Sequence, residues 1–540
     1  MYRDRIIYQI YPLSYKDSNN DGYGDINGII SKLDYLKDLG VGILWLSPVY
    51  ASDFKDNGYD IIDYYQIHPK FGTMEEFENL ISEANKRDIK IIMDLVINHT
   101  STNHVWFQAA LKDKNSKYRD YYYFRSGNGK KPPNNWNSSF SGSCWEPVKG
   151  EENMYYLHLY TIEQADLNYH NPEVIEEVEK ILKFYLDKGV AGFRCDVINQ
   201  IYKTTLANGK FRFFNCGKEH YESQEENFNI LKRFQDNVIS KYPGAFLVGE
   251  TSSITPEIGN KFLSRGCLQA FFEFEHAFCD MNGLIPIFRK RFRPKNLINP
   301  ILKWQEQVPW IGAYLENHDQ RRALTRFGDQ EKYPKESAKA LGMFLLSLKG
   351  TPFIYQGQEL GCVDYKDFKY EDLDDCMAKS AIETAKSLLK ISTKKAFKYV
   401  NRTINRDHAR YPMPWSDSIN GGFNDGGDTW IKVNTQYKEG INAEAEIQDP
   451  TSVFSFYKKM IHLRNNNKTL QEGRFLRIKS NSNVAKFIRQ TEDETLLIVV
   501  NLSNKKIKEL QPNYKVIISN DYDINKKYLK PYQGIIYKVR

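Results

Sequence analysis

The chain lacks the features that mark secreted disulfide-rich and membrane proteins. Its seven cysteines include no C-x-x-C pair, so neither a disulfide framework nor a zinc-ligand motif is indicated. No long uncharged apolar run is present, and even residues 342–355 are interrupted by Lys349. The opening MYRDRIIYQIYPLSY has basic residues but no apolar stretch of signal-peptide length. We therefore expect a cytoplasmic protein.

Internal repeats, low-complexity tracts and stripes of one charge sign are also missing. The 75 Lys and Arg residues exceed the 68 Asp and Glu residues by seven, and we interpret this charge as spread over the whole chain. Such a distribution predicts solvated surface and not nucleic-acid binding. What the 540 residues do contain is 41% hydrophobic and 14% aromatic side chains, enough for a large core and more than one domain.

Strand-like apolar runs alternate with amphipathic helical ones, which predicts a parallel sheet with crossover helices. Helix signals agree: Thr73 and Glu76 form a capping box, and Asn171 followed by Pro172 opens another helix. Eight strands are expected, so the predicted fold is α/β, a (β/α)8 TIM barrel. The strands span residues 6–11, 42–49, 89–98, 192–197, 245–250, 268–274, 311–317 and 351–356, with the first helices over 28–39 and 74–87.

Two insertions and a change of pattern divide the chain. Residues 100–167 follow the third strand and are too long for an ordinary loop, so we interpret them as an inserted domain over the barrel mouth. A second insertion, 361–449, precedes a helix over 452–463, and short alternating strands such as 495–502 predict a C-terminal antiparallel β domain. The predicted domains are the barrel (1–99 and 168–468), the inserted domain (100–167) and the C-terminal domain (469–540).

Four short motifs place acids or their partners at the carboxyl ends of predicted strands. Parallel barrels keep their chemistry at that end, so these side chains can meet in one pocket. Three carboxylates collected in this way indicate carboxylate catalysis, because buried unpaired acids are too costly to gather by chance. The motifs are DLVINH (94–99), GFRCD (192–196), VGE (248–250) and ENHD (316–319).

In their order and strand positions these motifs resemble those of the α-amylase family of glycoside hydrolases, and the resemblance covers essentially the whole chain. Three further segments resemble its exo-acting α-glucosidase branch, which includes oligo-1,6-glucosidases, dextran glucosidases and trehalose-6-phosphate hydrolases. They are RIIYQIYPLSYKDSNNDGYGD near the start, QADLN (164–168) and RDHAR (406–410).

The resemblance implies catalytic roles for three carboxylates. Asp196 would be the nucleophile and Glu250 the general acid/base, while Asp319 would bind sugar hydroxyls and help to distort the ring. Hydrolysis with retention needs one ionised and one protonated carboxyl about 5–5.5 Å apart. Arg194, two residues before Asp196 on an extended strand, should lie on the same side and favour the ionised aspartate.

The resemblance also implies a binding set for the glucose ring that is cleaved. Tyr59 and Asp60 of NGYD, with His99 and His318, would supply a stacking face and hydrogen-bonding groups. For either histidine, a hydrogen-bonded core role is the alternative. Arg410 would close the pocket by pairing with Asp60, although its flank YPMPW departs from the TPMQW usual in this branch.

One loop near the start has calcium-loop spacing, with oxygen ligands at alternate positions and a glycine at the turn. It is not an EF-hand, because the twelfth position is Gly28 and the loop follows a strand. The resemblance implies a structural Ca²⁺, with Mg²⁺ as the alternative ion, and no organic cofactor; a metal-free turn is the other interpretation. The implied ligands are Asp17, Asn19, Asp21, the Tyr23 carbonyl and Asp25.

Val197, directly after Asp196, bears on the linkage that is cleaved. In the branch that this chain resembles, Val there accompanies α-1,6 cleavage and Thr accompanies α-1,4 cleavage. An apolar β-branched wall suits a 1,6-linked leaving group, although simple strand packing is the alternative. We therefore expect a retaining exo-acting α-glucosidase that releases glucose from the non-reducing end of short α-1,6-linked gluco-oligosaccharides such as isomaltose and panose.

Other activities of the same family stay open: trehalose-6-phosphate hydrolase, α-1,4-glucosidase, and sucrose hydrolase or isomerase. A phosphosugar would need cations at the pocket rim, and Lys203, Lys210 and Arg212 follow the fourth strand. A non-catalytic amylase-like protein or a polysaccharide-binding module is disfavoured, because neither needs an intact acid set. We expect a small oligosaccharide substrate, no nucleic-acid or membrane partner, and a monomer or homodimer.

Overall fold

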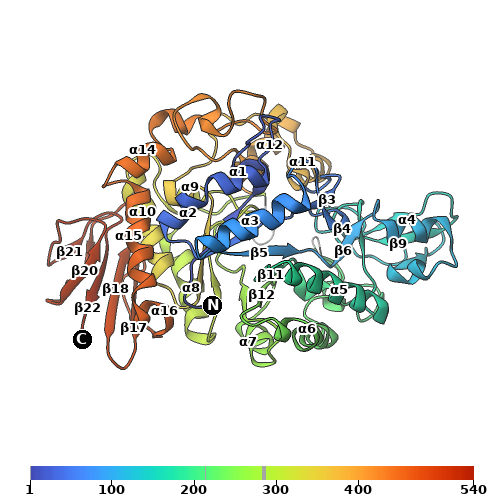
Figure 1. Cartoon of the computed structure of the whole chain (residues 1–540), viewed down its shortest axis with the longest axis horizontal. Helices are drawn as coiled ribbons and strands as arrows, with labels where there is room; N and C mark the ends of the chain where they lie inside the picture. Colours follow the sequence, from blue (N-terminus) through green and yellow to red (C-terminus); the bar gives the residue numbers. More distant parts are fainter. Residues whose placement is uncertain (1, 213–214, 283–286) are drawn as a thin grey trace.

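The computed structural model describes residues 2–212, 215–282 and 287–540. Eight parallel strands curl into a nearly closed barrel at the centre of the molecule (Figure 1), which confirms the predicted TIM barrel. Hydrogen-bonded neighbours run in the order β13, β12, β11, β5, β2, β1, β15, β14, and β13 lies beside β14 at the closure. These strands are β1 (Ile7–Ile10), β2 (Ile43–Leu46), β5 (Lys90–Leu95), β11 (Gly192–Cys195), β12 (Phe246–Glu250), β13 (Ala270–Phe272), β14 (Gly312–Ala313) and β15 (Thr351–Tyr355).

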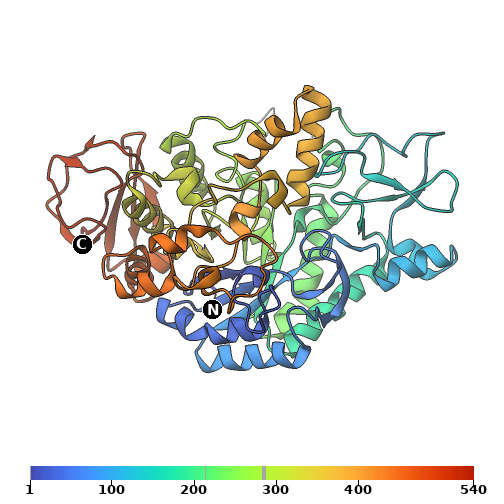
Figure 2. The same cartoon turned by 90° about the horizontal axis from the view of Figure 1, so that it is seen from above.

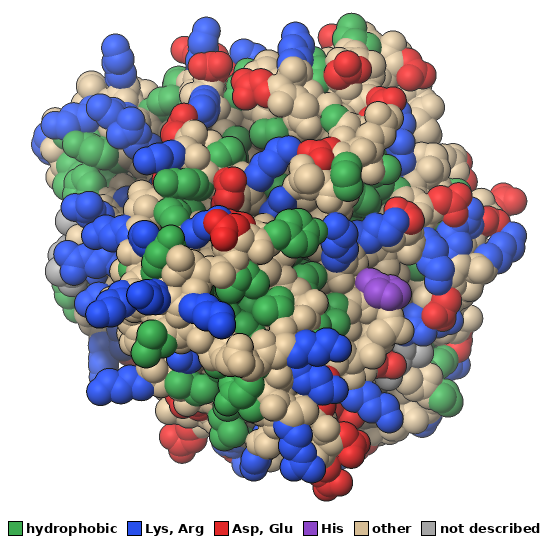
Figure 3. All heavy atoms as spheres, turned by 90° about the vertical axis from the view of Figure 1, so that its left-hand side faces the viewer, with side chains coloured by type: hydrophobic (Ala, Val, Ile, Leu, Met, Phe, Trp, Pro, Cys, Tyr) green, Lys and Arg blue, Asp and Glu red, His purple; other side chains and the backbone are tan. Residues whose placement is uncertain are grey.

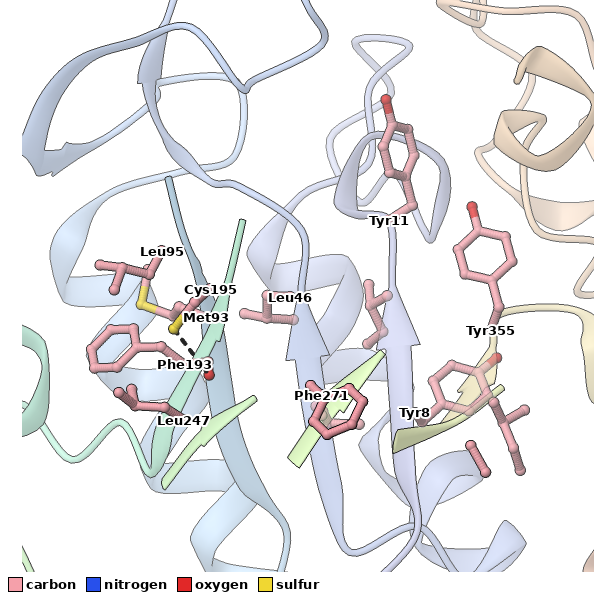
Figure 4. Packing of buried hydrophobic residues seen from close by; sticks show 14 of the residues in the cluster. Tyr8, Tyr11, Leu46, Met93, Leu95, Phe193, Cys195, Leu247, Phe271 and Tyr355 are labelled. Carbon is pink, nitrogen blue, oxygen red and sulfur yellow. Dashed lines mark hydrogen bonds between the residues drawn. The ribbon is translucent and has the colours of Figure 1, made fainter. Parts of the chain in front are cut away.

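Side chains alternate between the two faces of each barrel strand. One set, including Ile92 and Val248, forms a cluster made mostly of strand residues that fills the barrel. The other set, including Phe193 and Leu247, packs against the helices and appears in Figure 4. Because the alternation continues to the strand ends, the polar residues that follow the inner set also point into the barrel mouth.

Helices surround the barrel, and their ends carry the expected signals. Thr73 and Glu76 form the predicted capping box of α3, and Asn171 caps α5 with Pro172 in its first turn. The helix predicted over 28–39 is two helices, because Lys32 between them leaves helical geometry. The helices are α1 (Ile26–Ser31), α2 (Leu33–Leu39), α3 (Met74–Lys86), α5 (Pro172–Asp187), α6 (Glu225–Asn237), α7 (Pro256–Ser264), α8 (Pro294–Gln307), α9 (Ala323–Phe327), α10 (Pro334–Ser347) and α15 (Val453–Asn465).

The segment inserted after β5 lies at the right of Figure 1 and holds a small antiparallel sheet in the order β7, β9, β8. Its two ends are tied together by the pairing of β6 with β10, which sets His99 opposite Asp166. A short hairpin of β3 and β4 lies beside it. The elements are β3 (Tyr50–Ser52), β4 (Ile61–Ile67), β6 (His99–Ser101), α4 (Val105–Lys112), β7 (Phe124–Ser126), β8 (Trp145–Pro147), β9 (Met154–Leu157) and β10 (Gln164–Asp166).

The second insertion, after β15, is helical and approaches the inserted domain from the other side of the barrel mouth, as the orange helices of Figure 2 show. Its elements are α11 (Cys376–Leu389), α12 (Thr393–Asn401), α13 (Asp407–Arg410) and α14 (Ala443–Gln448). The two insertions therefore flank the carboxyl ends of the barrel strands.

The C-terminal domain lies at the left of Figure 1, at the far end from the inserted domain. A five-stranded antiparallel sheet in the order β16, β17, β18, β22, β20 is joined by a two-stranded ribbon of β19 and β21. Across the described residues, no helix has both the length and the apolar character needed to span a membrane. The elements are α16 (Lys468–Glu472), β16 (Arg474–Arg477), β17 (Val484–Gln490), β18 (Thr495–Asn501), β19 (Ile507–Lys508), β20 (Lys515–Ser519), β21 (Tyr528–Leu529) and β22 (Gly534–Lys538).

Candidate active site

Arg194 on β11 lies at the centre of the site, and its guanidinium contacts three carboxylates. Nη1 bonds Asp196 Oδ1 at 2.6 Å and also bonds Asp94, while Nη2 lies 2.6 Å from Glu250 Oε2. The side chains of Arg194 and Asp94 are 2% and 0% exposed, so these charges interact with little screening. Although burial opposes a cation, the surrounding acids raise the pKa of Arg194.

Asp196 follows β11 and Glu250 ends the neighbouring β12, and the two terminal nitrogens of the Arg194 guanidinium hold one carboxyl each, at 2.6 Å. A single guanidinium thus keeps the two carboxyls together at the barrel mouth, as a nucleophile and an acid/base that act on one bond require. The Val197 amide donates to Glu250 Oε2 at 3.1 Å and fixes its orientation. Burial raises the pKa of Asp196 well above its ordinary value, with Arg194 opposing and Glu250 adding to this effect.

Asp319, which follows β14, completes the predicted trio and is the most open of the three, with 30% of its side chain exposed. Its Oδ1 accepts from Arg410 at 2.8 Å and from Arg406 at 3.1 Å, and His318 Nε2 lies 3.3 Å from its Oδ2. Burial by itself would raise the pKa of Asp319. The guanidinium groups of Arg406 and Arg410 oppose this effect and hold that pKa below the usual range, so the carboxylate is ionised.

A buried chain of hydrogen bonds joins His318 to the central arginine. The Gln9 amide nitrogen lies 2.7 Å from His318 Nδ1, which makes Nδ1 the acceptor and leaves the proton on Nε2. Nε2 lies 2.7 Å from the Tyr59 hydroxyl, which donates in turn to Asp94 at 3.2 Å. Burial lowers the pKa of His318 to about 3, so its ring is neutral at working pH. Tyr59 stacks on that ring with centroids 5.4 Å apart.

His99 lies in the same pocket, where Gln164 and the Tyr59 carbonyl contact its Nε2 at 3.0 and 3.1 Å. Its ring packs near Tyr160 with centroids 5.4 Å apart. Burial lowers the pKa of His99, which favours the neutral form. The structure therefore brings both predicted histidines to the site as neutral hydrogen-bonding groups.

Lys203 does not lie at the pocket rim. Its ammonium is fully buried, 2.6 Å from Asp166 and 2.8 Å from the Asn98 side chain, where it ties QADLN to DLVINH. Arg212, the second predicted rim cation, pairs with Glu219. Of the three cations considered for a phosphosugar, two are thus engaged in ion pairs and only Lys210 is exposed without one among the described residues.

The predicted pairing of Arg410 with Asp60 is wrong. Asp60 is buried and accepts from Ser52 Oγ at 2.7 Å and from the Asp53 amide at 3.1 Å, whereas Arg410 binds Asp319. These donors belong to the same β3–β4 hairpin as Asp60, so they satisfy its carboxylate locally. Burial raises the pKa of Asp60 to about 6.

Arg406, the first arginine of RDHAR, is a site residue that was not predicted from sequence. Its guanidinium contacts three aspartates: Asp375 at 2.7 Å, and Asp56 and Asp319 at 3.1 Å each. Arg406 precedes α13 and Arg410 ends it, and residues four apart lie on one face of a helix. That spacing was the available signal, and it brings both arginines to the same carboxylate.

A contact between the two insertions closes one side of the mouth. Ser141 Oγ lies 2.5 Å from Ser380 Oγ on α11, and Ser380 also donates to the Phe140 carbonyl. The Phe140 ring lies beneath Arg406, with 5.5 Å between centroid and guanidinium carbon, and contacts the Tyr160 ring. We call this Ser141–Ser380 contact the clasp; it joins the two insertions at one side of the barrel mouth, and the rings of Phe140 and Tyr160 lie beside it.

Val197 has a left-handed backbone, with φ 37° and ψ 38°. That region is costly for a β-branched residue, and such strain persists where surrounding structure demands it. Here it lets the Val197 amide reach Glu250 while the half-buried side chain stands beside the catalytic pair. The residue is therefore placed to contact a leaving group.

The predicted metal loop is closed by its own hydrogen bonds. Asp17 accepts from the amides of Asn19, Asn20 and Gly22, and Asp25 caps α1 through the Gly28 amide. Such turns orient oxygens, yet within the described parts of the chain no three His, Cys, Asp or Glu side chains converge as a metal cluster. Ion binding would thus have to draw on amide and carbonyl oxygens of Asn19 and Tyr23 and exchange some of these hydrogen bonds for coordination.

Known proteins are similar to this chain along its full length. Residues 9–473 match the sequence profile described as the α-amylase catalytic domain. An oligo-1,6-glucosidase of Parageobacillus thermoglucosidasius is 41% identical over 100% of this chain and 99% of its own. A crystal structure of Bacillus licheniformis trehalose-6-phosphate hydrolase has a TM-score of 0.94 at 37% identity, covering 99% of each chain. Isomaltulose synthase of Klebsiella sp. LX3 reaches 0.93 at 35% identity, covering 100% of this chain and 99% of that one.

Proposed function

The chain belongs to the α-amylase family, and from that premise we propose that it is a retaining exo-α-glucosidase acting on short α-1,6-linked gluco-oligosaccharides. The observation that carries this proposal is the Asp196–Glu250 pair, whose carboxyls are held by a single guanidinium, each 2.6 Å from one of its terminal nitrogens. Double displacement needs two carboxyls so placed, one to attack the anomeric carbon and one to protonate the leaving group.

In the proposed reaction the Asp196 carboxylate attacks the anomeric carbon while Glu250 gives its proton to the departing glycosidic oxygen. The C–O bond breaks, and glucose becomes esterified to Asp196. Glu250, now a carboxylate, takes a proton from water, whose oxygen attacks the same carbon and restores both side chains. Arg194 holds the two carboxyls in position and stabilises a negative charge on either of them.

Asp319 is the proposed anchor for sugar hydroxyls. Two arginines hold it ionised, and its partly exposed oxygens can bind adjacent hydroxyls more strongly as the ring flattens toward the oxocarbenium shape. The Tyr59–His318 stack supplies a flat wall, and His99 a neutral donor or acceptor. The clasp is consistent with exo action, because it ties the two insertions together at one side of the barrel mouth, where a continuous glucan would have to pass.

Two observations support the α-1,6 preference: the residue at position 197 and the names of the curated relatives. Curated relatives at 38–41% identity are named oligo-1,6-glucosidases, and Val197 offers an apolar wall beside the catalytic pair. Trehalose-6-phosphate hydrolase is the second candidate, since a protein of that name shares this fold at 37% identity. It is the weaker one, because the buried Lys203 is unavailable to a phosphate.

The test is hydrolysis of isomaltose, panose, maltose, sucrose, trehalose and trehalose 6-phosphate by the purified protein, with the anomer of the released glucose followed by NMR. We expect α-glucose first and the highest kcat/KM on isomaltose and panose. A preference for trehalose 6-phosphate would replace the substrate class, isomaltulose formed from sucrose would make the protein an isomerase, and β-glucose as first product would refute the retaining mechanism.

The same proposal includes a cytoplasmic location and a calcium ion in the Asp17–Asp25 loop. All seven cysteines are free, which fits a reducing compartment. The loop offers Asp17, Asn19, Asp21, the Tyr23 carbonyl and Asp25, an all-oxygen set of the kind that hard cations take. Melting of chelator-treated protein with and without added Ca²⁺ tests it; an unchanged Tm would favour the metal-free turn.

A further inference from the structure

The net positive charge of the chain resides in its C-terminal domain. Residues 469–540 contain 14 Lys and Arg against 7 Asp and Glu, an excess of seven that equals the excess of the whole chain. The interpretation of an evenly spread charge is therefore corrected: barrel and inserted domain are balanced. Figure 3 faces this end of the molecule, where Lys and Arg side chains are prominent.

Part of this charge is ordered on the outer face of the β19–β21 ribbon. Ile507 and Leu529 are paired and buried, so their neighbours along each strand point outward. Lys508 stands opposite Tyr528, and the amide contacts of residues 509 and 511 with 527 and 526 continue the register. The face, which we call the ribbon face, consists of Lys506, Lys508, Leu510, Lys526, Tyr528 and Lys530.

The lysines of the ribbon face are mostly uncompensated. Lys530 pairs with Asp521 and Asp523, and Lys506 lies 3.3 Å from the centroid of the Tyr528 ring. As far as the structure describes the chain, Lys506, Lys508 and Lys526 have no acidic side chain within 4 Å. Like charges on adjacent strands repel each other, so binding to an anionic surface would reduce the repulsion between these lysines.

Large apolar side chains near these lysines are exposed to solvent. Leu510 is 74% exposed, and Tyr522 in the turn before β21 is 88% exposed. A leucine gains nothing from a phosphodiester backbone, and the Tyr528 ring is covered by Lys506 and so is closed to base stacking. Apolar and tyrosine side chains among lysines are typical of peripheral contact with a lipid interface.

We propose that the ribbon face docks this enzyme on an anionic membrane surface. The lysines are attracted by the anionic headgroups, and the exposed side chains of Leu510 and Tyr522 enter the interfacial layer. The C-terminal domain lies at the far end of the molecule from the inserted domain (Figure 1), so docking through the ribbon face keeps the inserted domain away from the membrane. This revises the expectation of no membrane partner and does not depend on which sugar is cleaved.

The test is co-sedimentation of the full-length protein with vesicles of equal parts phosphatidylglycerol and phosphatidylcholine, against vesicles of phosphatidylcholine alone. We expect binding to the anionic vesicles only, falling at least about tenfold between 50 and 500 mM salt as charges are screened. The variant K506E/K508E/K526E should lose at least about tenfold in affinity, and Leu510→Ser should lose a few-fold.

The matched control reverses three exposed lysines of the inserted domain, K112E/K130E/K149E, with the same change in net charge. Both triple variants should keep wild-type hydrolysis, which shows that they are folded. The proposal is overturned by absent binding to anionic vesicles, by equal binding to neutral ones, by an equal loss in the control, or by ribbon-dependent binding that is tighter for single-stranded DNA than for vesicles.

Discussion

Two of the places that bury arginine in this molecule do so in opposite ways. In the active site Arg194 is surrounded by the carboxylates of Asp94, Asp196 and Glu250. Where the C-terminal domain meets the barrel, Arg464 and Arg489 are equally buried but, among the described residues, donate only to carbonyl oxygens, chiefly those at the end of α10. Burial lowers the pKa of Arg464 to about 9, whereas the pKa of Arg194 is raised.

The difference separates a functional charge from a structural one. The carbonyls at the C-terminus of α10 lack helix partners and carry partial negative charge, so the two arginines cap that helix from α15 and β17. In the active site the acids exceed the cation, which leaves negative charge that must be shared with a proton or a substrate. We therefore expect substitutions at the first place to change activity most, and those at the second to change stability alone.

The largest expected effect comes from Asp196→Asn, which removes the proposed nucleophile while keeping shape. We expect kcat/KM on isomaltose to fall by about 10³-fold or more, with Tm within about 2 °C, because the amide still accepts from Arg194. Steady-state kinetics and calorimetry measure both. Asp88→Asn, an exposed ion-paired residue, is the control and should keep full activity. Wild-type turnover in the Asp196 variant would remove the nucleophile from the mechanism.

Arg194→Met should damage both stability and activity. It leaves three buried acids without their common cation, which costs about 3–5 kcal/mol of unfolding free energy at neutral pH. The loss should shrink as pH falls, because protonated acids need no counter-charge. Urea unfolding at pH 5 and pH 7 measures it, and a pH-independent loss would contradict the assigned charge balance.

Glu359 is a third kind of buried acid: among the described residues it accepts hydrogen bonds from the hydroxyls of Tyr8 and Tyr35 at 2.7 Å each and forms no ion pair. Burial raises its pKa to about 7 in the folded state, above the unfolded value. The folded protein therefore holds this proton more tightly, and the stability it gives is complete below about pH 4.5 and is lost as pH rises through 7. Relative to Glu359→Gln, the wild type should lose about 3 kcal/mol between pH 4.5 and pH 8. The prediction is refuted if the free energy of unfolding changes with pH in the same way in the two proteins.

Arg489→Met tests the structural arginines. The Gly473 and Ser347 carbonyls lose their donors, so we expect a loss of about 1–3 kcal/mol in unfolding free energy. At a temperature where the variant is folded, kcat/KM should stay within about twofold of wild type. A catalytic defect there would mean that the junction and the active site are coupled, and the contrast between the two places would fail.

Val197→Thr is the subtlest change. Thr keeps β-branching and so keeps the backbone strain, but it adds a hydroxyl beside the leaving group. We expect the ratio of kcat/KM for isomaltose over maltose to fall about tenfold, which corresponds to about 1.4 kcal/mol. Val197→Ile, equally apolar, is the control that should keep the ratio. An unchanged ratio in the Thr variant would assign Val197 to packing.

The barrel and the acid trio were predictable from sequence because both follow from local rules. Period-two alternation along β11 and β12 places Arg194, Asp196 and Glu250 on one face, whatever surrounds them. The partners of Arg410 and Lys203 were not predictable. They depend on which charged groups meet when α13 and the inserted domain fold over the barrel, and local donors had already satisfied Asp60. The lysines of the ribbon face could not be grouped from sequence, because only the pairing register of β19 and β21 shows that they share one face.

The hydroxyls of Ser141 and Ser380 tie the two insertions together at one side of the barrel mouth, and we propose that this contact restricts access to the ends of a glucan. The rate of hydrolysis then depends on the number of chain termini in solution and not on the mass of sugar. The same weight of carbohydrate is hydrolysed faster as many di- and trisaccharides than as a few long polymers.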